Sequence, residues 1–511
     1  MAILVTYFLT ILVGILVMGI WNCIKRCGKP WKWRPIRILL FSVRVHELHE
    51  RIAKVLDRRN GTIVAKGLIS WVTGGDVVLT SDPANVQHMM STRFSNYLKG
   101  PEFKKRFDIF GDGPFNLDDQ EWMHHRKNIR AYFNHQKFHS FFAKTLEYCI
   151  ETELIPDLRL VSSNNAVVDL QALLRKHVGY FGRSFSTGLQ PASFRGAGID
   201  NELLTKAMDD TMEAIFFRYV VPEKIWKLQR ALGVGKEKNL SRAKRTLDEA
   251  LSRCISIKEE GLRQGRVPSD DEDFSALKGY LTGHHLTGLE PHALTYDIIK
   301  ETVFSLIFAL EGTVSTTLTW FFWLLSKNLH VETRIREELE TIFARRDAKK
   351  RFVAWFEDKE FSKMIYLHAA LCETLRLFPP VPFEPRNPVA QEMLPSGHEV
   401  SPETRVVISA YAMGRMKSVW GEDCCDFKPE RWITTDGDIR HEPAHKFFAF
   451  SAGPRICPGK DLAFTLMKIF SATIILNYDV QVIQDRPVTI KTSSLLQMKH
   501  GLLVTLTKRL A

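Results

Sequence analysis

The stretch with the clearest chemical potential surrounds one cysteine near the end of the chain. It is FFAFSAGPRICPGKDLAF, residues 447–464, with Cys457 between Gly453 and Gly459 and directly before a helical apolar pattern. Glycines permit a tight turn that exposes backbone, and a helix N-terminus stabilises a thiolate. A lone cysteine in apolar surroundings is most often inert packing, but Arg455 adds a partner for an anionic cofactor group. Together these residues predict a thiolate that ligates a metal.

The segment FSAGPRICPG resembles the haem-thiolate signature Phe-x-x-Gly-x-Arg-x-Cys-x-Gly of the cytochromes P-450. Each defining position is filled, by Phe450, Gly453, Arg455, Cys457 and Gly459. The resemblance implies haem b as the cofactor, Cys457 as the axial iron ligand and Arg455 as the partner of a haem propionate. A thiolate ligand pushes electron density toward iron and favours O–O cleavage, which is why this chemistry needs cysteine.

A second motif, CETLR, places Glu373 and Arg376 three residues apart on one helix face. Taken alone, this spacing is that of an ordinary surface ion pair. It is followed by LFPPVPF and then by FKPERW with Arg431, and so resembles the family's buried Glu-Arg-Arg cluster. The resemblance implies that these three residues hold the haem-binding core together.

A third motif, EWMHHRKNIR, gives Trp122 and Arg126 the Trp-x-x-x-Arg spacing that resembles the family's contacts to the haem propionates. His124 and His125 lie between them. Adjacent helical side chains point about 100° apart and chelate a metal poorly. Surface positions are therefore predicted for both histidines.

The segment IFALEGTVSTTLTWFF, residues 307–322, carries polar residues where a membrane span or a buried helix would be purely apolar. The resemblance places it on the long helix over the distal face of the haem, where an acid and the following alcohol relay protons. Thr313 keeps the alcohol, Gly312 takes the acid's position, and Glu311 is rotated away by about 100°. We predict catalytic roles for Thr313 and, if the helix bulges, for Glu311. The alternative for Thr313 is a bond to a backbone carbonyl one turn back.

Most long segments that must position these residues show helical apolar spacing, as in ELLTKAMDDTMEAIFF and VETRIREELETIFARR. Strand signals are short and lie near Val77, near Val406 and in GLLVTLTKR at the end of the chain. Residues 263–274 have the composition of an exposed loop between helices. The sequence therefore predicts a mainly α fold with a minor β subdomain, and the resemblance implies the cytochrome P-450 fold over residues 46–511.

The first residues differ in composition from the rest. Residues 3–21, ILVTYFLTILVGILVMGIW, carry no charge and have the length of a membrane-spanning helix. A cleaved signal peptide is opposed by the lack of a basic region before the run and of a cleavage site after it. The basic residues that follow keep the chain cytosolic by the positive-inside rule. We predict an anchor helix at residues 1–24, a basic linker at 25–45, and a single-pass protein of the endoplasmic reticulum membrane.

The net charge of +12 and the eight cysteines limit the class of protein further. The cysteines are irregularly spaced in a long chain, so a disulfide framework is excluded and a reducing location fits. No dense basic run alternates with aromatics, so nucleic acid is the least favoured partner. The resemblance implies an NADPH-cytochrome reductase as partner, and four basic residues are candidates for docking it: Lys127, Arg130, Lys446 and Lys460.

Several longer segments, among them YLHAALCETLRLFPPVPFE and GRMKSVWGEDCCDFKPERWI, resemble the plant fatty-acid omega-hydroxylase and midchain-alkane-hydroxylase group. The resemblance implies an O2-using enzyme, fed by NADPH through a flavin reductase, that hydroxylates a long-chain alkane or fatty acid. The altered distal acid favours an alternative, the oxidative phenol coupling of an alkaloid precursor by the group's noroxomaritidine synthase branch. A complete thiolate motif behind a membrane anchor argues against a haem sensor or a structural protein.

Overall fold

The core of the protein is built around one long helix, α16 (Tyr296–Lys327). It begins where the Thr295 side chain accepts a hydrogen bond from the Ile298 amide, and it ends before Asn328. Among the helices of the described residues, it alone is long and apolar enough to span a membrane. Most of this stretch is buried against other helices, as expected for a core helix.

The structure is a computed structural model, and the residues it describes all belong to the unit His46–Ala511. They are residues 47–65, 75–266, 272–282, 295–344, 361–483 and 487–509. The predicted anchor, residues 1–24, and the predicted linker, residues 25–45, lie outside them.

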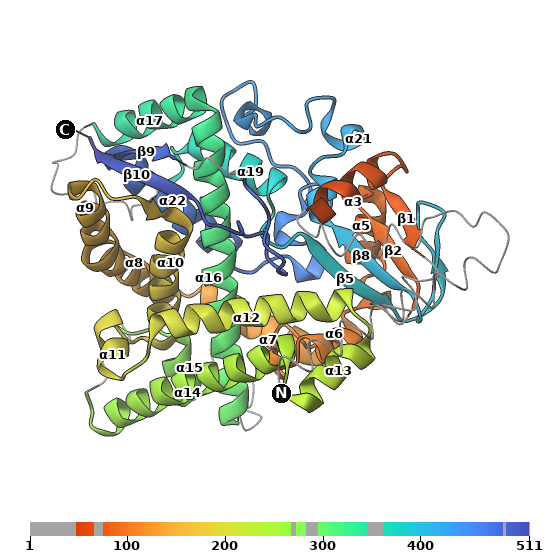
Figure 1. Ribbon diagram of the computed structural model, residues 1–511, viewed down its shortest axis with the longest axis horizontal. Helices are drawn as coiled ribbons and strands as arrows, with labels where there is room; N and C mark the ends of the chain where they lie inside the picture. Colours follow the sequence, from red (N-terminus) through yellow and green to blue (C-terminus); the bar gives the residue numbers. More distant parts are fainter. Residues whose placement is uncertain are drawn as a thin grey trace, which may run out of the picture. The chain divides into compact units, whose positions relative to one another are not determined.

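Helices make up most of the described residues (Figure 1). The longer ones, besides α16, are α7 (Asp119–Phe133), α8 (Gln136–Cys149), α10 (Leu170–Thr187), α12 (Asn201–Val220), α14 (Gly235–Arg263), α17 (Leu329–Phe343), α19 (Ile365–Leu377) and α22 (Lys460–Asn477). The shorter ones are α3 (Leu48–Asp57), α5 (Pro83–Gln87), α6 (Gly100–Arg106), α9 (Ile155–Ser163), α11 (Pro191–Gly196), α13 (Glu223–Leu232), α15 (Ala276–Thr282), α20 (Ala410–Met413) and α21 (Lys417–Trp420).

The strands of the residues that the structure describes form three small sheets. They are β1 (Thr62–Ala65), β2 (Val77–Thr80), β3 (Tyr97–Leu98), β4 (Val168–Asp169), β5 (Phe383–Pro388), β6 (Glu392–Met393), β7 (Glu399–Val400), β8 (Arg405–Ser409), β9 (Tyr478–Val482) and β10 (Leu503–Lys508). The largest sheet has the order β1-β2-β8-β5-β3, the second the order β4-β10-β9, and the third pairs β6 with β7. The strand signals near Val77 and Val406 are confirmed as β2 and β8, which pair in parallel with Val78 opposite Val406.

The apolar faces of the helices meet along α16. One cluster of buried side chains joins the second half of α16 to α8, α10, α17, α19 and α22, and a second cluster joins its first half to α12 and α14. Burial of this apolar surface is the main favourable term in folding. In Figure 1, α16 runs through the middle of the described helices, with β5, β8, β2 and β1 to one side and β9 and β10 to the other. The prediction of a mainly α fold with a minor β part is confirmed.

Candidate haem site

The cysteine loop precedes α22 as a tightly held turn. The Cys457 amide donates to the Phe450 carbonyl oxygen at 2.8 Å, which folds the loop back on itself. Gly453 has φ +61°, and a Cβ there would lie 1.7 Å from the Met90 carbonyl oxygen, so only glycine fits. Gly459 needs no such freedom, since its φ is −94°. The loop therefore presents a half-buried Cys457 at the N-terminal end of α22.

The surroundings of Cys457 favour, on balance, the neutral thiol over a free thiolate. Burial raises the pKa of the Cys457 thiol, whereas the Gly459 amide and the Arg126 guanidinium act in the opposite direction. Arg126 itself donates to the Ile456 carbonyl oxygen, next to the cysteine. A thiol in such surroundings loses its proton readily when a metal ion takes the proton's place.

Three arginines from distant segments gather beside this loop. They are Arg126 of α7, Arg386 of β5 and Arg455 of the cysteine loop. Arg455 donates to Asp118 at 2.5 Å and lies 4.3 Å from the ring centroid of Trp122. Yet the Nε atom of each of the three arginines is buried and has no hydrogen-bond partner within the described part of the chain.

These cations are crowded as well as incompletely paired. Burial, and then the charge of Arg386, lower the pKa of Arg455 to about 10. Burial, followed by the charges of Arg455 and Arg386, lowers the pKa of Lys99 well below its usual range. A buried cluster of cations with free donors matches a ligand that carries carboxylates. The residues present therefore fit haem, whose iron would meet Cys457 and whose propionates would meet the guanidinium groups.

The two histidines of EWMHHRKNIR take no part in this arrangement. His124 and His125 are half-buried, and this partial exposure is compatible with the surface positions predicted for both. Their rings lie 6.3 Å apart and nearly perpendicular. Among the described residues, no group of three histidine, cysteine or acidic side chains is arranged to hold a metal ion. A single thiolate remains the candidate ligand.

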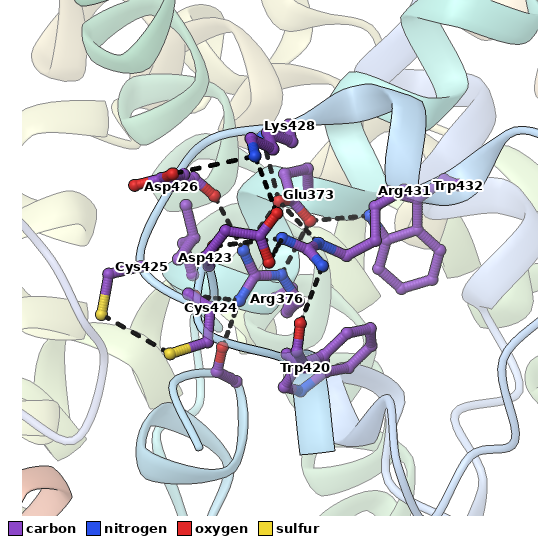
Figure 2. A network of polar contacts seen from close by, with 12 residues as sticks. Glu373, Arg376, Trp420, Asp423, Cys424, Cys425, Asp426, Lys428, Arg431 and Trp432 are labelled. Atoms are coloured by element: carbon purple, nitrogen blue, oxygen red, sulfur yellow. Dashed lines mark hydrogen bonds and ion pairs between the residues drawn. The ribbon is translucent and has the colours of Figure 1, made fainter. Parts of the chain in front are cut away.

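Glu373, Arg376 and Arg431 meet in a buried network (Figure 2). Glu373 and Arg376 are fully buried and form two parallel hydrogen bonds of 2.7 Å. Arg431 lies 3.4 Å from the same carboxylate, and the Trp432 indole donates to it at 2.8 Å. The surface ion-pair alternative is thereby excluded for Glu373 and Arg376.

The remaining donors of the network hold the segment before the cysteine loop. Arg376 donates to the carbonyl oxygens of Gly414, Cys424 and Asp426. Arg431 donates to those of Trp420 and Asp423. The network thus fastens α19 to the backbone of residues 414–426, from which the chain continues toward Cys457.

Two residues at the centre of α16 differ from their neighbours in exposure. Ala309 is exposed and Thr313 is half-buried, although most residues around them are buried. The Thr313 hydroxyl donates to the Ala309 carbonyl oxygen at 2.6 Å, so the backbone bond expected as an alternative is present. This bond uses the hydroxyl proton and leaves the oxygen's lone pairs available as acceptors.

Glu311 points in a different direction. Its carboxylate is buried against α10, 3.0 Å from Arg183 and 3.7 Å from Arg175. Gly179 of α10 makes room for this ion pair, because a Cβ there would lie 2.9 Å from the carboxylate. This position argues against direct proton donation by Glu311 to a substrate. Gly312 faces Leu495, whose Cδ1 would lie 2.5 Å from a Cβ at position 312.

Sequence reasoning missed Arg386, Lys99 and the arginines that pair with Glu311. The available signals were weak. Arg386 is a buried charged residue in the mostly half-buried strand β5. Gly179 lies in the middle of a helix, where a glycine often allows the close approach of another group.

Comparison with known proteins gives matches over nearly the whole chain. Residues 29–506 match the family model of the cytochromes P-450. Alkane hydroxylase MAH1 of Arabidopsis thaliana is 38% identical over 491 residues, covering 95% of each chain. Noroxomaritidine synthase 1 of Narcissus pseudonarcissus is 35% identical, covering 94% of this chain and 92% of that protein. Cytochrome P-450 86B1 of Arabidopsis thaliana is 33% identical, covering 92% and 84%. This chain therefore belongs to the cytochrome P-450 family, as a haem-dependent monooxygenase that receives electrons from NADPH through a reductase.

Proposed function

We propose that the protein hydroxylates a long-chain alkane or fatty acid. The observation that carries the proposal is the similarity to alkane hydroxylase MAH1 over 95% of both chains. The reaction joins RH, O2, NADPH and a proton to give ROH, water and NADP+. One oxygen atom enters the substrate, and the other leaves as water with two hydrogens.

An apolar group of rings beside α16 supports a hydrocarbon substrate. Phe110 packs against Phe115, Phe304 and Phe308, with ring centroids 5.2, 5.0 and 4.9 Å apart. Phe115 and Phe308 are only partly buried, and Phe308 is next to the exposed Ala309. Rings of this kind bind alkyl chains through burial of apolar area, without requiring a polar group on the ligand.

Phenol coupling of an alkaloid precursor is the second candidate, because position 312 lacks an acid and noroxomaritidine synthase 1 is 35% identical. In that reaction the substrate loses two hydrogens, and O2, NADPH and a proton yield two water molecules and NADP+. Leu495 occupies the space that an acid at position 312 would need. Phenolic O–H bonds are weaker than alkane C–H bonds, so this chemistry tolerates a less controlled proton supply.

A product screen separates the two reactions. We expect the reductase-reconstituted enzyme to add one oxygen to a long-chain alkane or fatty acid, detected by mass spectrometry as a gain of one oxygen mass. Loss of two hydrogens from a phenolic alkaloid precursor, without oxygen gain on alkanes or fatty acids, would replace the first proposal by the second. A CO difference spectrum without a thiolate-type band would contradict the role proposed for Cys457 in both reactions.

In this proposal Cys457 binds the haem iron, and Arg126, Arg386 and Arg455 bind the propionates. Bound haem supplies the oxygen activation. Thr313 then accepts or passes a proton on the face of α16 where Ala309 is exposed. The aromatic rings near Phe308 exclude water.

Replacing Arg386 by glutamine is expected to speed haem loss by about 10- to 100-fold, since a charge-assisted hydrogen bond contributes about 1.5–3 kcal/mol. The rate is measured by transfer of haem to apomyoglobin. Arg93→Gln is the matched control, because Arg93 is exposed and forms an ion pair with Glu392. Equal rates of haem loss in the two variants would show that Arg386 does not bind a propionate.

We further propose that residues 1–24 anchor the protein in the endoplasmic reticulum membrane and that a basic surface docks the reductase. Lys127 and Arg130 are exposed and suit such docking, which mainly raises association rates. Lys446 pairs with Glu442, and Lys460 is half-buried, so these two are weaker candidates.

A further inference from the structure

A small cavity borders α16 at the glycine that replaces the family's acid. Residues from four segments line it: Arg175 of α10, Met208 and Met212 of α12, Phe308, Glu311 and Gly312 of α16, and Leu495 and Gln497 of the segment before β10. The cavity has room for about one water molecule.

Three polar atoms at this cavity have no hydrogen-bond partner among the described residues. They are Nε of Arg175, Oε1 of Glu311 and Oε1 of Gln497. The exposed fractions of these residues are 9%, 1% and 3%. Leaving such groups unpaired costs about 1–3 kcal/mol each. Three unpaired groups at one cavity therefore indicate a bound partner.

The types of these atoms identify the partner. Arg175 offers one N–H donor, whereas Glu311 and Gln497 each offer an acceptor oxygen. A water molecule accepts one such bond and donates two, and buried waters typically make about three bonds. The Nε of Arg175 and Oε1 of Glu311 are 3.7 Å apart, too far for a direct hydrogen bond and suited to a bridging water.

The surrounding charges connect this position to solvent. Arg175 also pairs with Asp209 at 2.5 Å, and the Asp209 side chain is 25% exposed. Asp209 in turn lies 3.0 Å from Lys491. Each turnover places two hydrogens on the oxygen atom that leaves as water, and Gly312 has no side-chain proton to supply. The Glu311 carboxylate lines the cavity and is held there by Arg183 and Arg175.

We propose that Arg175, Glu311 and Gln497 bind one ordered water molecule beside Gly312. This water takes the place of the acid that position 312 lacks, and supplies protons to the reaction beside α16. The proposal makes Glu311 and Gln497 positioning residues. It rests on the oxygenase function above, but not on the identity of the substrate.

Gln497→Met is the sharpest test, because it removes one acceptor at similar volume and leaves the buried ion pairs intact. In crystals of the haem-loaded protein we expect an ordered water within hydrogen-bond distance of the three atoms, and its loss in the variant. With reductase and NADPH, we expect the ratio of hydrogen peroxide to oxygenated product to rise on the order of tenfold, as for a lost proton relay. Glu311→Gln should act in the same direction, although Arg183 then loses its partner.

Glu213→Gln is the control, since Glu213 also joins α12 to Lys491 but does not line the cavity. The control should keep the water and the wild-type peroxide ratio. A dry cavity in the wild-type crystal, or equal peroxide ratios in Gln497→Met and Glu213→Gln, would overturn the proposal. Failure of the proposed substrate assignment is distinguishable, because the ordered water is observed in crystals that need no substrate.

Discussion

Replacement of Cys457 by alanine is expected to reduce NADPH-driven oxygenation to background and to remove the thiolate-type band from the CO difference spectrum. Cys457 is the thiol that the loop from Phe450 to Gly459 presents beside Arg126 and Arg455. Among the described residues no cluster of metal-binding side chains offers a substitute ligand. Loss of the thiolate removes the electron donation that favours O–O cleavage, so activity falls even if haem still enters the site.

Two further variants separate ligation from folding. Cys457→His should retain part of the haem, but its spectrum should lack the thiolate band. Such a result would show that the site is folded and that the ligand has changed. Cys425→Ser changes an exposed cysteine and should leave band and activity unchanged. A Cys457→Ala protein that keeps the thiolate band would exclude Cys457 as the ligand.

The elements with strong local patterns were predictable from the sequence. The strands near Val77 and Val406 are short runs rich in β-branched residues, and both appear in the structure as β2 and β8. Their parallel pairing was not predictable, because it joins segments far apart along the chain through tertiary contacts. The exposed loop predicted at residues 263–274 is confirmed as non-helical at the described residues 264–266 and 272–274, between α14 and α15, although Asp273 is buried.

The site was predictable where its residues form motifs and unpredictable where they act singly. The rotation of Glu311 away from the acid's usual position follows from helix geometry alone, since one residue turns by about 100°. Its pairing with Arg183 and Arg175 depends on how α10 packs against α16, which no local pattern encodes. Arg386 is likewise brought to Arg455 only by the sheet that contains β5.

Replacement of Glu373 by glutamine is expected to destabilise the protein by about 3–5 kcal/mol, because it leaves Arg376 as a buried charge without a counterion. A loss of this size is comparable to a large part of the total stability of a domain, about 5–15 kcal/mol. We expect a lower denaturant midpoint and a small yield of haem-containing protein. Glu430→Gln is the control, as Glu430 pairs with Arg334 at an exposed position and should cost about 0–1 kcal/mol.

The role of Arg376 can be separated from its charge. Arg376→Lys keeps a cation beside Glu373 but lacks the planar fork that reaches the carbonyl oxygens of Gly414, Cys424 and Asp426. If the network serves mainly to hold residues 414–426, Arg376→Lys should lose haem nearly as readily as Glu373→Gln. The variant with leucine at both 373 and 376 should then also lose haem, because it lacks the same donors. Wild-type haem retention in Arg376→Lys would show instead that the ion pair alone stabilises the core, because the buried carbonyl oxygens would then have lost their donors without consequence.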